Sequence, residues 1–447
     1  MTSALAGAVQ NRTRVRKAFA STTFRQAAGF AISSATLGAL GMATSALLAR
    51  SMDVESYTGY TFGKQLLLFS AMFFEFGLFL PTARMLARSD PVERHRVTGA
   101  VVTFFVPVSV LFGVTVLALS WMVDACFNVH AGPALRVVAL VSMGYPLDFV
   151  CLQTAQGLGR LHCYSVASVL SRTGFLALLI AMPAVGVRLT SSGVLLADAL
   201  FLLTGWVALL AHLRPRFTGL RASMAQMVQG ARDYGFSAYV GRVLSMGTYH
   251  MDMLMLGAGS DPRSFACYMC AASLAFPVGL PGAGLATALF GRLARQPRMH
   301  LSWLAAVTVA SALPAAVLSM LAAPLVRLVY SDGFLMAAKL VPLLALGQVI
   351  SAVTRLFNTF LAAQGLGSDL RTAALTLTVS NLFLNLALIP GFQATGAAWA
   401  SLLALTVNLV VHVMQYRRAV RGGSTAPRVE EAVSGNRPPT GSTAAAQ

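Results

Sequence analysis

Long apolar runs recur along the whole chain, and they constrain its fold more than any other feature. Only 11% of the residues are charged and the mean hydropathy is +0.70, whereas soluble domains carry about 25% charged residues. An apolar run of about 20 residues can cross a bilayer as an α-helix, because the helix satisfies its own backbone polar groups. The sequence therefore predicts an all-α integral membrane protein with about twelve transmembrane helices. The expected spans are residues 27–49, 61–83, 98–122, 134–156, 165–187, 191–212, 236–258, 266–290, 302–327, 340–363, 372–392 and 395–416.

Positive charge is concentrated in the short segments between the apolar runs. The formal net charge is +18, and most of the 33 lysine and arginine residues lie before the first span, after even-numbered spans or in the tail. Lysine and arginine accumulate in the cytoplasmic loops of membrane proteins. The distribution predicts that both termini are cytoplasmic, and it accounts for the basic charge without a nucleic-acid partner.

The two halves of the sequence share features at a constant shift of 208 residues. The segment Ala155–Gly159 is identical to Ala363–Gly367, and Asp53 falls on Asp261. Because the repeated unit contains six spans, an even number, both copies enter the membrane in the same orientation. We therefore expect two six-helix bundles related by a pseudo-twofold axis along the membrane normal, with a substrate path between them.

This repeat divides the chain into five parts. We expect a basic cytoplasmic N-terminus at 1–26, a first bundle at 27–212, a cytoplasmic linker at 213–235, a second bundle at 236–416 and a disordered cytoplasmic tail at 417–447. The linker contains both basic and apolar residues. It is either an amphipathic helix on the membrane surface or a plain connection.

Three arginines fall inside expected spans, where a charge is costly and usually faces a cavity or a partner. Counting from the span ends places Arg172, Arg242 and Arg355 in the cytoplasmic half of the membrane. A guanidinium donates paired hydrogen bonds to phosphate and keeps its charge when buried. We therefore expect at least two of these arginines to line a cavity that binds a substrate diphosphate. Alternatively, each is structural, extending to the interface or pairing with Asp148.

Acidic residues within the spans are candidates for ion coupling, since a carboxylate at membrane depth can carry a coupling proton. The candidates are Glu75, Asp148 and Asp252. Alternatively, a buried carboxylate is structural and pairs with a neighbour such as Lys64. We favour this structural interpretation for Asp198.

The sequence contains no motif typical of an enzyme or a metal site. Cys267 and Cys270 have Cys-x-x-Cys spacing, but they lie in an apolar stretch without a second pair. A structural zinc site needs four cysteine or histidine ligands, so we expect no metal. No nucleophile with its base and no phosphate-binding loop is evident. We therefore expect no catalytic residue and no cofactor.

Several passages resemble the polysaccharide transporter family. Leu48–Tyr60 contains an Ala-Arg pair, a short acidic loop and a Tyr-Thr-Gly-Tyr element, as in the family's connection between spans 1 and 2. Asp252–Leu256, followed by Asp261–Tyr268, is similar to the family's stretch between spans 7 and 8. Asn385–Pro390, followed by Gly396–Ala400, is similar to its closing block.

This resemblance implies a Wzx-type flippase of the multidrug/oligosaccharidyl-lipid/polysaccharide exporter superfamily. Such proteins move an undecaprenyl-diphosphate-linked oligosaccharide across the bacterial inner membrane for surface or exopolysaccharide biosynthesis. The resemblance also implies membrane lipids, a polysaccharide polymerase and export machinery as partners. The three arginines are assigned to the diphosphate by their depth alone, because none lies in a matching motif.

Three other functions stay open. One is a drug or cation antiporter of the related MATE group, whose cavity would be dominated by carboxylates and aromatic residues. A second is a relative of the lipid II flippases, which usually have fourteen spans. The third is an enzyme of polysaccharide polymerisation or ligation. An enzyme of that kind needs a long outer loop, and no outer loop expected here exceeds about a dozen residues.

Overall fold

The structure is a computed structural model in which every regular element is a helix among the residues described. The described residues are 22–127, 129–232, 236–259, 261–293, 296–364 and 366–421. Many large apolar side chains lie exposed on the outer faces, among them Leu140, Leu301 and Met320. Apolar surface of that extent is typical of a protein that faces lipid. The expected all-α membrane fold is confirmed, although the termini at 1–21 and 422–447 lie outside the described residues.

The first half contains nine helices within the described residues. They are α2 (Thr22–Ser51), α3 (Val54–Phe73), α4 (Phe79–Arg88), α5 (Pro91–Cys126), α6 (Gly132–Val138), α7 (Gly144–Gly157), α8 (Leu161–Ala184), α9 (Ser191–His212) and α10 (Leu220–Gly230). The second half repeats this order without a counterpart of α10. Its elements are α11 (Phe236–Gly259), α12 (Pro262–Ala275), η2 (Phe276–Gly279), α13 (Leu280–Leu293), α14 (Leu301–Met320), α15 (Ala322–Val329), η3 (Asp332–Phe334), α16 (Met336–Ala363) and α17 (Gly367–Arg421).

Helix α17 consists of two antiparallel passes. Gln393 has non-helical backbone angles, with φ 49° and ψ −127°. The side-chain amide of Gln415 donates to the carbonyl oxygen of Asp369 at 2.8 Å, so the chain folds back on itself at this kink. Eight described helices are long and apolar enough to cross a membrane. The second pass of α17, α11 and the interrupted pairs α3–α4 and α6–α7 complete the twelve passes.

The sequence repeat is present in the backbone. Helices α3 and α12 begin 208 residues apart, and each starts after an aspartate that caps it. The Asp53 carboxylate accepts from the amide of Ser56 at 2.9 Å, and the Asp261 carboxylate accepts from the amide of Ser264 at 2.8 Å. An aspartate cap satisfies amides that have no partner within their helix. The matched residues therefore begin the matched helices.

Three of the described passes are interrupted partway along their length. A turn at residues 74–78 separates α3 from α4, and Phe76 and Gly77 in it have positive φ values of 47° and 69°. A second turn, at 139–143, precedes α7. In the third pass, Pro277 lies in the 3₁₀ turn η2 between α12 and α13, where proline removes a helical donor. The expected spans 61–83 and 266–290 are therefore not continuous helices.

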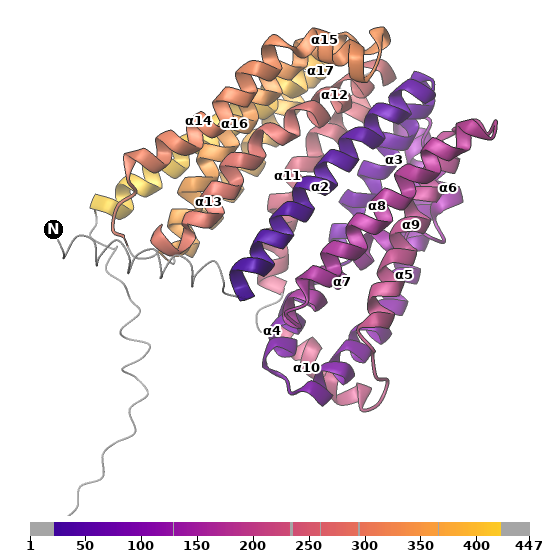
Figure 1. Ribbon diagram of the computed structural model, residues 1–447, viewed down its shortest axis with the longest axis vertical. Helices are drawn as coiled ribbons and strands as arrows, with labels where there is room; N and C mark the ends of the chain where they lie inside the picture. Colours follow the sequence, from indigo (N-terminus) through magenta and orange to yellow (C-terminus); the bar gives the residue numbers. More distant parts are fainter. Residues whose placement is uncertain are drawn as a thin grey trace, which may run out of the picture.

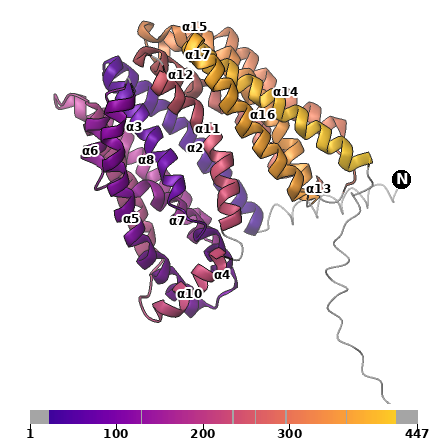
Figure 2. The same ribbon diagram turned by 180° about the vertical axis from the view of Figure 1, so that it is seen from behind.

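The two halves meet at one end and diverge at the other. The ribbons lie close near α12, α15 and the start of α3, and they separate toward α4, α10 and α13 (Figure 1, Figure 2). We call these the closed end and the linker end. At the closed end, the Arg50 guanidinium donates to the carbonyl oxygens of Leu328 and Arg327. Thr58 Oγ1 also donates to the carbonyl oxygen of Pro262, at 3.0 Å.

The linker between the halves contains helix α10, which packs against α4 and α5. Met227 of α10 is fully buried. Before α10, the amide of Arg216 donates to the carbonyl oxygen of His95 at 2.8 Å. A Cβ atom at Gly99 would clash with the Arg216 carbonyl oxygen, so only glycine allows this approach. The described part of the linker is therefore docked on the first bundle.

A charged cavity between the halves

The halves enclose a cavity of about 500 Å³. Helices α2, α3, α7, α8 and α9 of the first half form most of its wall, and α11, α12 and η2 of the second half complete it. The second half contributes apolar side chains, including Met253, Met269 and Phe276. The charged side chains among the described lining residues all come from the first half: Lys64, Asp148 and Arg172.

The two cations among these residues, Lys64 and Arg172, share one buried carboxylate. Asp198 of α9 is fully buried, and its side chain forms ion pairs with Lys64 Nζ at 3.2 Å and with the Arg172 guanidinium. Tyr145 Oη donates to the same carboxylate at 2.8 Å. Lys64 Nζ also donates to Tyr60 Oη at 3.0 Å. We call Lys64, Arg172 and Asp198 the cation cluster; its ionised side chains carry one net positive charge.

The packing of four helices fixes the cation cluster. Its members and Tyr145 come from α3, α7, α8 and α9. The side chains of Lys64 and Arg172 are 22% and 27% exposed, so each reaches from the buried carboxylate toward the cavity. Taking a charge out of water is costly unless it is paired. The pairing with Asp198 allows both cations to remain ionised at this depth.

A second polar group lies at another part of the same wall. Tyr164 Oη of α8 donates to Asp148 Oδ1 of α7 at 2.8 Å. The rings of Tyr164 and Trp206 are stacked, with centroids 5.0 Å apart and planes at 9°. The indole N–H of Trp206 has no hydrogen-bond partner among the described residues. We call Asp148, Tyr164 and Trp206 the aromatic corner.

The sequence grouped three arginines by their expected depth in the membrane, but the structure does not bring them together. Arg172 lies in the middle of α8, and its ion-pair partner is Asp198 rather than Asp148. Arg355 is exposed and lines a different cavity, of about 290 Å³, between α16 and the two passes of α17. Arg242 lies on α11, and its side chain is outside the described residues. The structure therefore shows no shared site for Arg172 and Arg355.

Asp252 lies in a buried polar cluster of the second half. Ser401 Oγ and Tyr268 Oη both donate to Asp252 Oδ2, the latter at 3.2 Å. Asn381 lies near the carboxylate, and Asn385 Nδ2 donates to Asn381 Oδ1 at 2.9 Å. Asp252 Oδ1 and Asn385 Oδ1 are buried without a partner among the described residues. The cluster therefore has spare acceptors that a proton or a small cation would satisfy.

Glu75 occupies the turn between α3 and α4, where it is 3% exposed. Tyr239 of α11 donates to the carbonyl oxygen of the nearby Phe73 at 3.0 Å, so this turn contacts the second half. Glu75 is not among the described residues that line the charged cavity. It lies in the break between two helices, and its expected role in ion coupling stays a prediction.

The sequence indicated Lys64 only as a structural partner of a buried carboxylate, whereas in the structure it also lines the charged cavity. Its position inside the span 61–83 is a signal, because an intramembrane lysine is rare and usually paired. The expected pairing of Asp198 with Lys64 is confirmed. The roles of Tyr145 and Trp206 had no such signal, because they depend on which helix faces are neighbours in the bundle.

Solved structures share this arrangement. No family model and no curated protein match the sequence. A lipid II flippase MurJ in an inward closed conformation superimposes with a TM-score of 0.69 at 13% identity, covering 88% of this chain and 89% of that chain. An inward-facing MATE multidrug transporter superimposes with a TM-score of 0.64 at 13% identity, covering 86% of this chain and 94% of that chain. The MATE multidrug transporter DinF-BH, solved as a complex, superimposes with a TM-score of 0.63 at 16% identity, covering 89% of this chain and 96% of that chain. The chain therefore has the fold that these membrane transporters share, with two six-helix bundles around a central cavity.

Proposed function

We propose that the protein is a flippase that moves an undecaprenyl-diphosphate-linked oligosaccharide across the bacterial inner membrane by alternating access. It would belong to the multidrug/oligosaccharidyl-lipid/polysaccharide exporter superfamily and serve surface polysaccharide biosynthesis. A polysaccharide polymerase and export machinery would receive its product. The structural likeness to a lipid II flippase supports a lipid-linked substrate.

The cation cluster is the observation that carries this proposal. Lys64 and Arg172 share a single carboxylate, so one positive charge is left for a ligand. Both side chains retain exposure toward the cavity. A guanidinium and an ammonium are the side chains that proteins use to bind phosphate groups. An anionic head group would therefore be attracted to a cavity that repels cations at this point.

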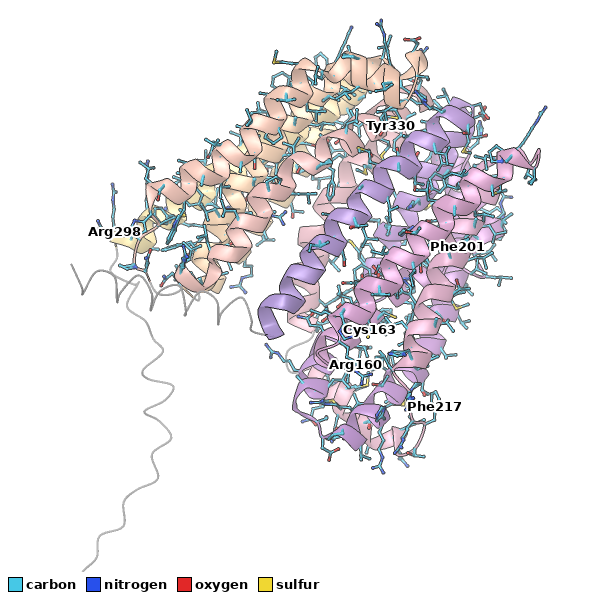
Figure 3. The ribbon with its side chains drawn as sticks, viewed as in Figure 1. Arg160, Cys163, Phe201, Phe217, Arg298 and Tyr330 are labelled. Carbon is cyan, nitrogen blue, oxygen red and sulfur yellow. The ribbon has the colours of Figure 1, made fainter. Side chains whose placement is uncertain are left out.

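The linker end is the cytoplasmic side in this proposal. Figure 3 shows Arg160, Phe217 and Arg298 toward the ends where the halves diverge, and Tyr330 near the end where they meet. Basic residues at the diverging ends agree with the positive-inside distribution. With the far end held shut by Arg50 and Thr58, the substrate would enter from the cytoplasmic leaflet.

Asp252 is the residue we propose for ion coupling. Its carboxylate has an oxygen without a partner among the described residues, and hydroxyl groups from two passes, Tyr268 of α12 and Ser401 of α17, donate to its other oxygen. Binding of a proton or a small cation would change contacts between α11 and α17. Asp252→Asn is expected to reduce transport that is driven by an imposed ion gradient. Full gradient-driven transport by this variant would contradict the coupling role.

A cation antiporter is the second candidate, and one observation favours it. Asp148 forms no ion pair among the described residues, and it lies beside the stacked rings of Tyr164 and Trp206. A carboxylate next to aromatic faces can bind an organic cation. This function predicts that transport of a lipophilic cation depends on Asp148 and is independent of Lys64.

Export of surface polysaccharide tests the two functions in cells. A strain that lacks the gene is complemented with the wild type, with Lys64→Gln or with Lys339→Gln. Lys339 is an exposed lysine on α16 outside the cavity lining, so it serves as a charge-matched control. We expect Lys64→Gln to stop export and to trap lipid-linked repeat units on the cytoplasmic side. Normal export with Lys64→Gln and with Arg172→Gln would overturn the proposal.

A further inference from the structure

The cation cluster and the aromatic corner lie at two levels of the same cavity wall. On α8, Tyr164 and Arg172 are eight residues apart, and on α9 Asp198 and Trp206 are separated by the same number. Each pair therefore differs by about 12 Å along its helix. Because α8 and α9 run in opposite directions, both helices place the aromatic residue nearer the linker end. A ligand that touches both levels must be longer than a single phosphate.

The groups at the aromatic corner fit a polyhydroxylated ring. Tyr164 engages Asp148 Oδ1 and leaves the other carboxylate oxygen to accept from a ligand. Trp206 is 2% exposed and lines the cavity, and its indole N–H lacks an acceptor among the described residues. A sugar hydroxyl can donate to the free carboxylate oxygen, and the indole N–H beneath the surface is a donor still without an acceptor among the described residues. The ring of Tyr164, which is half-buried and stacked on Trp206, adds an apolar surface against which the C–H face of a sugar can pack.

Helix α7 joins the two levels. Tyr145, which donates to Asp198, and Asp148 are three residues apart on it and therefore lie on the same face. Arg172 is also close enough to interact electrostatically with Asp148 as well as with Asp198. A ligand with a phosphate at the cation cluster would thus extend along α7 toward the aromatic corner.

We propose that the aromatic corner is a saccharide subsite, which binds the sugar ring attached to the diphosphate held by the cation cluster. The inference rests on the proposed function and specifies its substrate as a glycosyl diphosphate rather than a bare lipid diphosphate. Recognition of the first sugar would let the protein reject the lipid carrier that has no sugar attached. The competing occupant of the corner is an organic cation bound to Asp148.

Direct binding to the purified full-length protein tests the subsite. The probes are farnesyl diphosphate, the same lipid carrying one glucose residue, and tetraphenylphosphonium. Affinities are measured by isothermal titration calorimetry in detergent. We expect the glucose residue to raise the affinity about tenfold, which is the range of one or two hydrogen bonds to a charged group. Tetraphenylphosphonium is expected not to compete.

Variants separate the two levels of the cavity. Asp148→Asn and Trp206→Leu are expected to remove the gain from glucose and to leave the affinity for farnesyl diphosphate unchanged. Trp206→Phe keeps an aromatic face and should retain part of the gain. Lys64→Gln is expected to weaken both lipid probes by the same factor. The controls Asp124→Asn and Trp399→Leu change a carboxylate and an indole away from the cavity lining, so neither should alter binding.

The outcomes distinguish the subsite from the flippase function. If glucose adds no affinity, or if the gain survives both Asp148→Asn and Trp206→Leu, the saccharide subsite is wrong. Binding of tetraphenylphosphonium that is lost in Asp148→Asn would assign the corner to an organic cation instead. If Lys64→Gln changes the affinity of neither lipid probe, the proposed function fails independently of the subsite.

Discussion

Lys64 Nζ lies 3.2 Å from Asp198 Oδ2, and this contact joins α3 to α9 inside the first bundle. The same carboxylate also binds Arg172 and accepts from Tyr145, so four helices meet at one acidic side chain. The contact therefore has two consequences. It stabilises the bundle, and it places two cations beside the cavity with one carboxylate between them.

The stability of the first bundle should depend strongly on Asp198. Asp198→Asn leaves two neighbouring cations without their counter-ion, and breaking a buried pair in this way costs about 3–5 kcal/mol. We expect a loss near the lower end of that range, because Lys64 and Arg172 keep some contact with the cavity. Denaturant unfolding in detergent measures it. The control Asp124→Asn breaks a partly exposed ion pair with Arg136 and should cost about 0–1 kcal/mol. Equal losses for the two variants would contradict a structural role for Asp198.

The sequence predicted the passes and the repeat because those features depend on local properties. A run of apolar residues is long enough to span, and capping aspartates such as Asp53 and Asp261 begin helices wherever they occur. Helix α8 begins at Leu161 rather than at 165, so Arg172 lies at mid-helix. The turn at Glu75 was missed because its apolar neighbours also suit a continuous helix.

The composition of the cavity could not be predicted in the same way. Lys64 and Asp198 are 134 positions apart in the chain, and their contact depends on how α3 and α9 pack. Trp206 has no sequence signal for its stack with Tyr164, since an aromatic residue on an apolar helix is ordinary core. Depth alone grouped Arg355 with Arg172, whereas the helix faces point them into different cavities.

Gly257 should control how tightly the halves close. A Cβ atom at this position of α11 would clash with the ring of Phe62 on α3, which is fully buried. Gly257→Val therefore forces the contact between the halves apart, and overpacking of this kind costs about 1–3 kcal/mol. Thermal unfolding measures the loss. Gly41→Ala has open space around its new Cβ and should leave stability unchanged. An unchanged melting temperature for Gly257→Val would contradict tight packing of α11 against α3 at this contact.

Arg50 should hold the closed end shut. Its guanidinium binds the last carbonyl oxygens of α15, where the helix dipole favours a cation. Arg50→Gln weakens this contact, so we expect a larger population with the closed end open. Spin labels at Val187 and Met320, both exposed and on opposite halves, report the separation by pulsed electron resonance. An identical distance distribution in Arg50→Gln and in the control Arg188→Gln would contradict the restraint.

The matched caps should contribute equally and should lose their effect in acid. The amide of Ser56 holds the pKa of Asp53 below its usual value of 3.8. Burial raises the pKa of Asp261, but the hydrogen bonds from Ser264 outweigh the effect of burial, so the pKa of Asp261 is also below 3.8. Each carboxylate therefore stabilises the fold above pH 3.8, and the contribution is lost as the pH falls through the lowered pKa. Asp53→Ala and Asp261→Ala are each expected to cost about 1 kcal/mol at about pH 7. The loss in unfolding free energy is measured at neutral pH and at a pH below the lowered pKa. A loss that is equally large in acid would contradict the role of these carboxylates as caps.

The central claim is that the cation cluster carries an anionic lipid-linked substrate across the membrane. The most direct measurement is flipping of a lipid-linked oligosaccharide in proteoliposomes, followed by its accessibility to a membrane-impermeant lectin. We predict flipping by the wild type and by Lys339→Gln, and a loss of about tenfold or more for Lys64→Gln and Arg172→Gln, which each remove a charge-assisted contact with phosphate. Tetraphenylphosphonium should not be transported. Undiminished flipping by both variants, or transport of the cation without flipping of the lipid, would contradict this account.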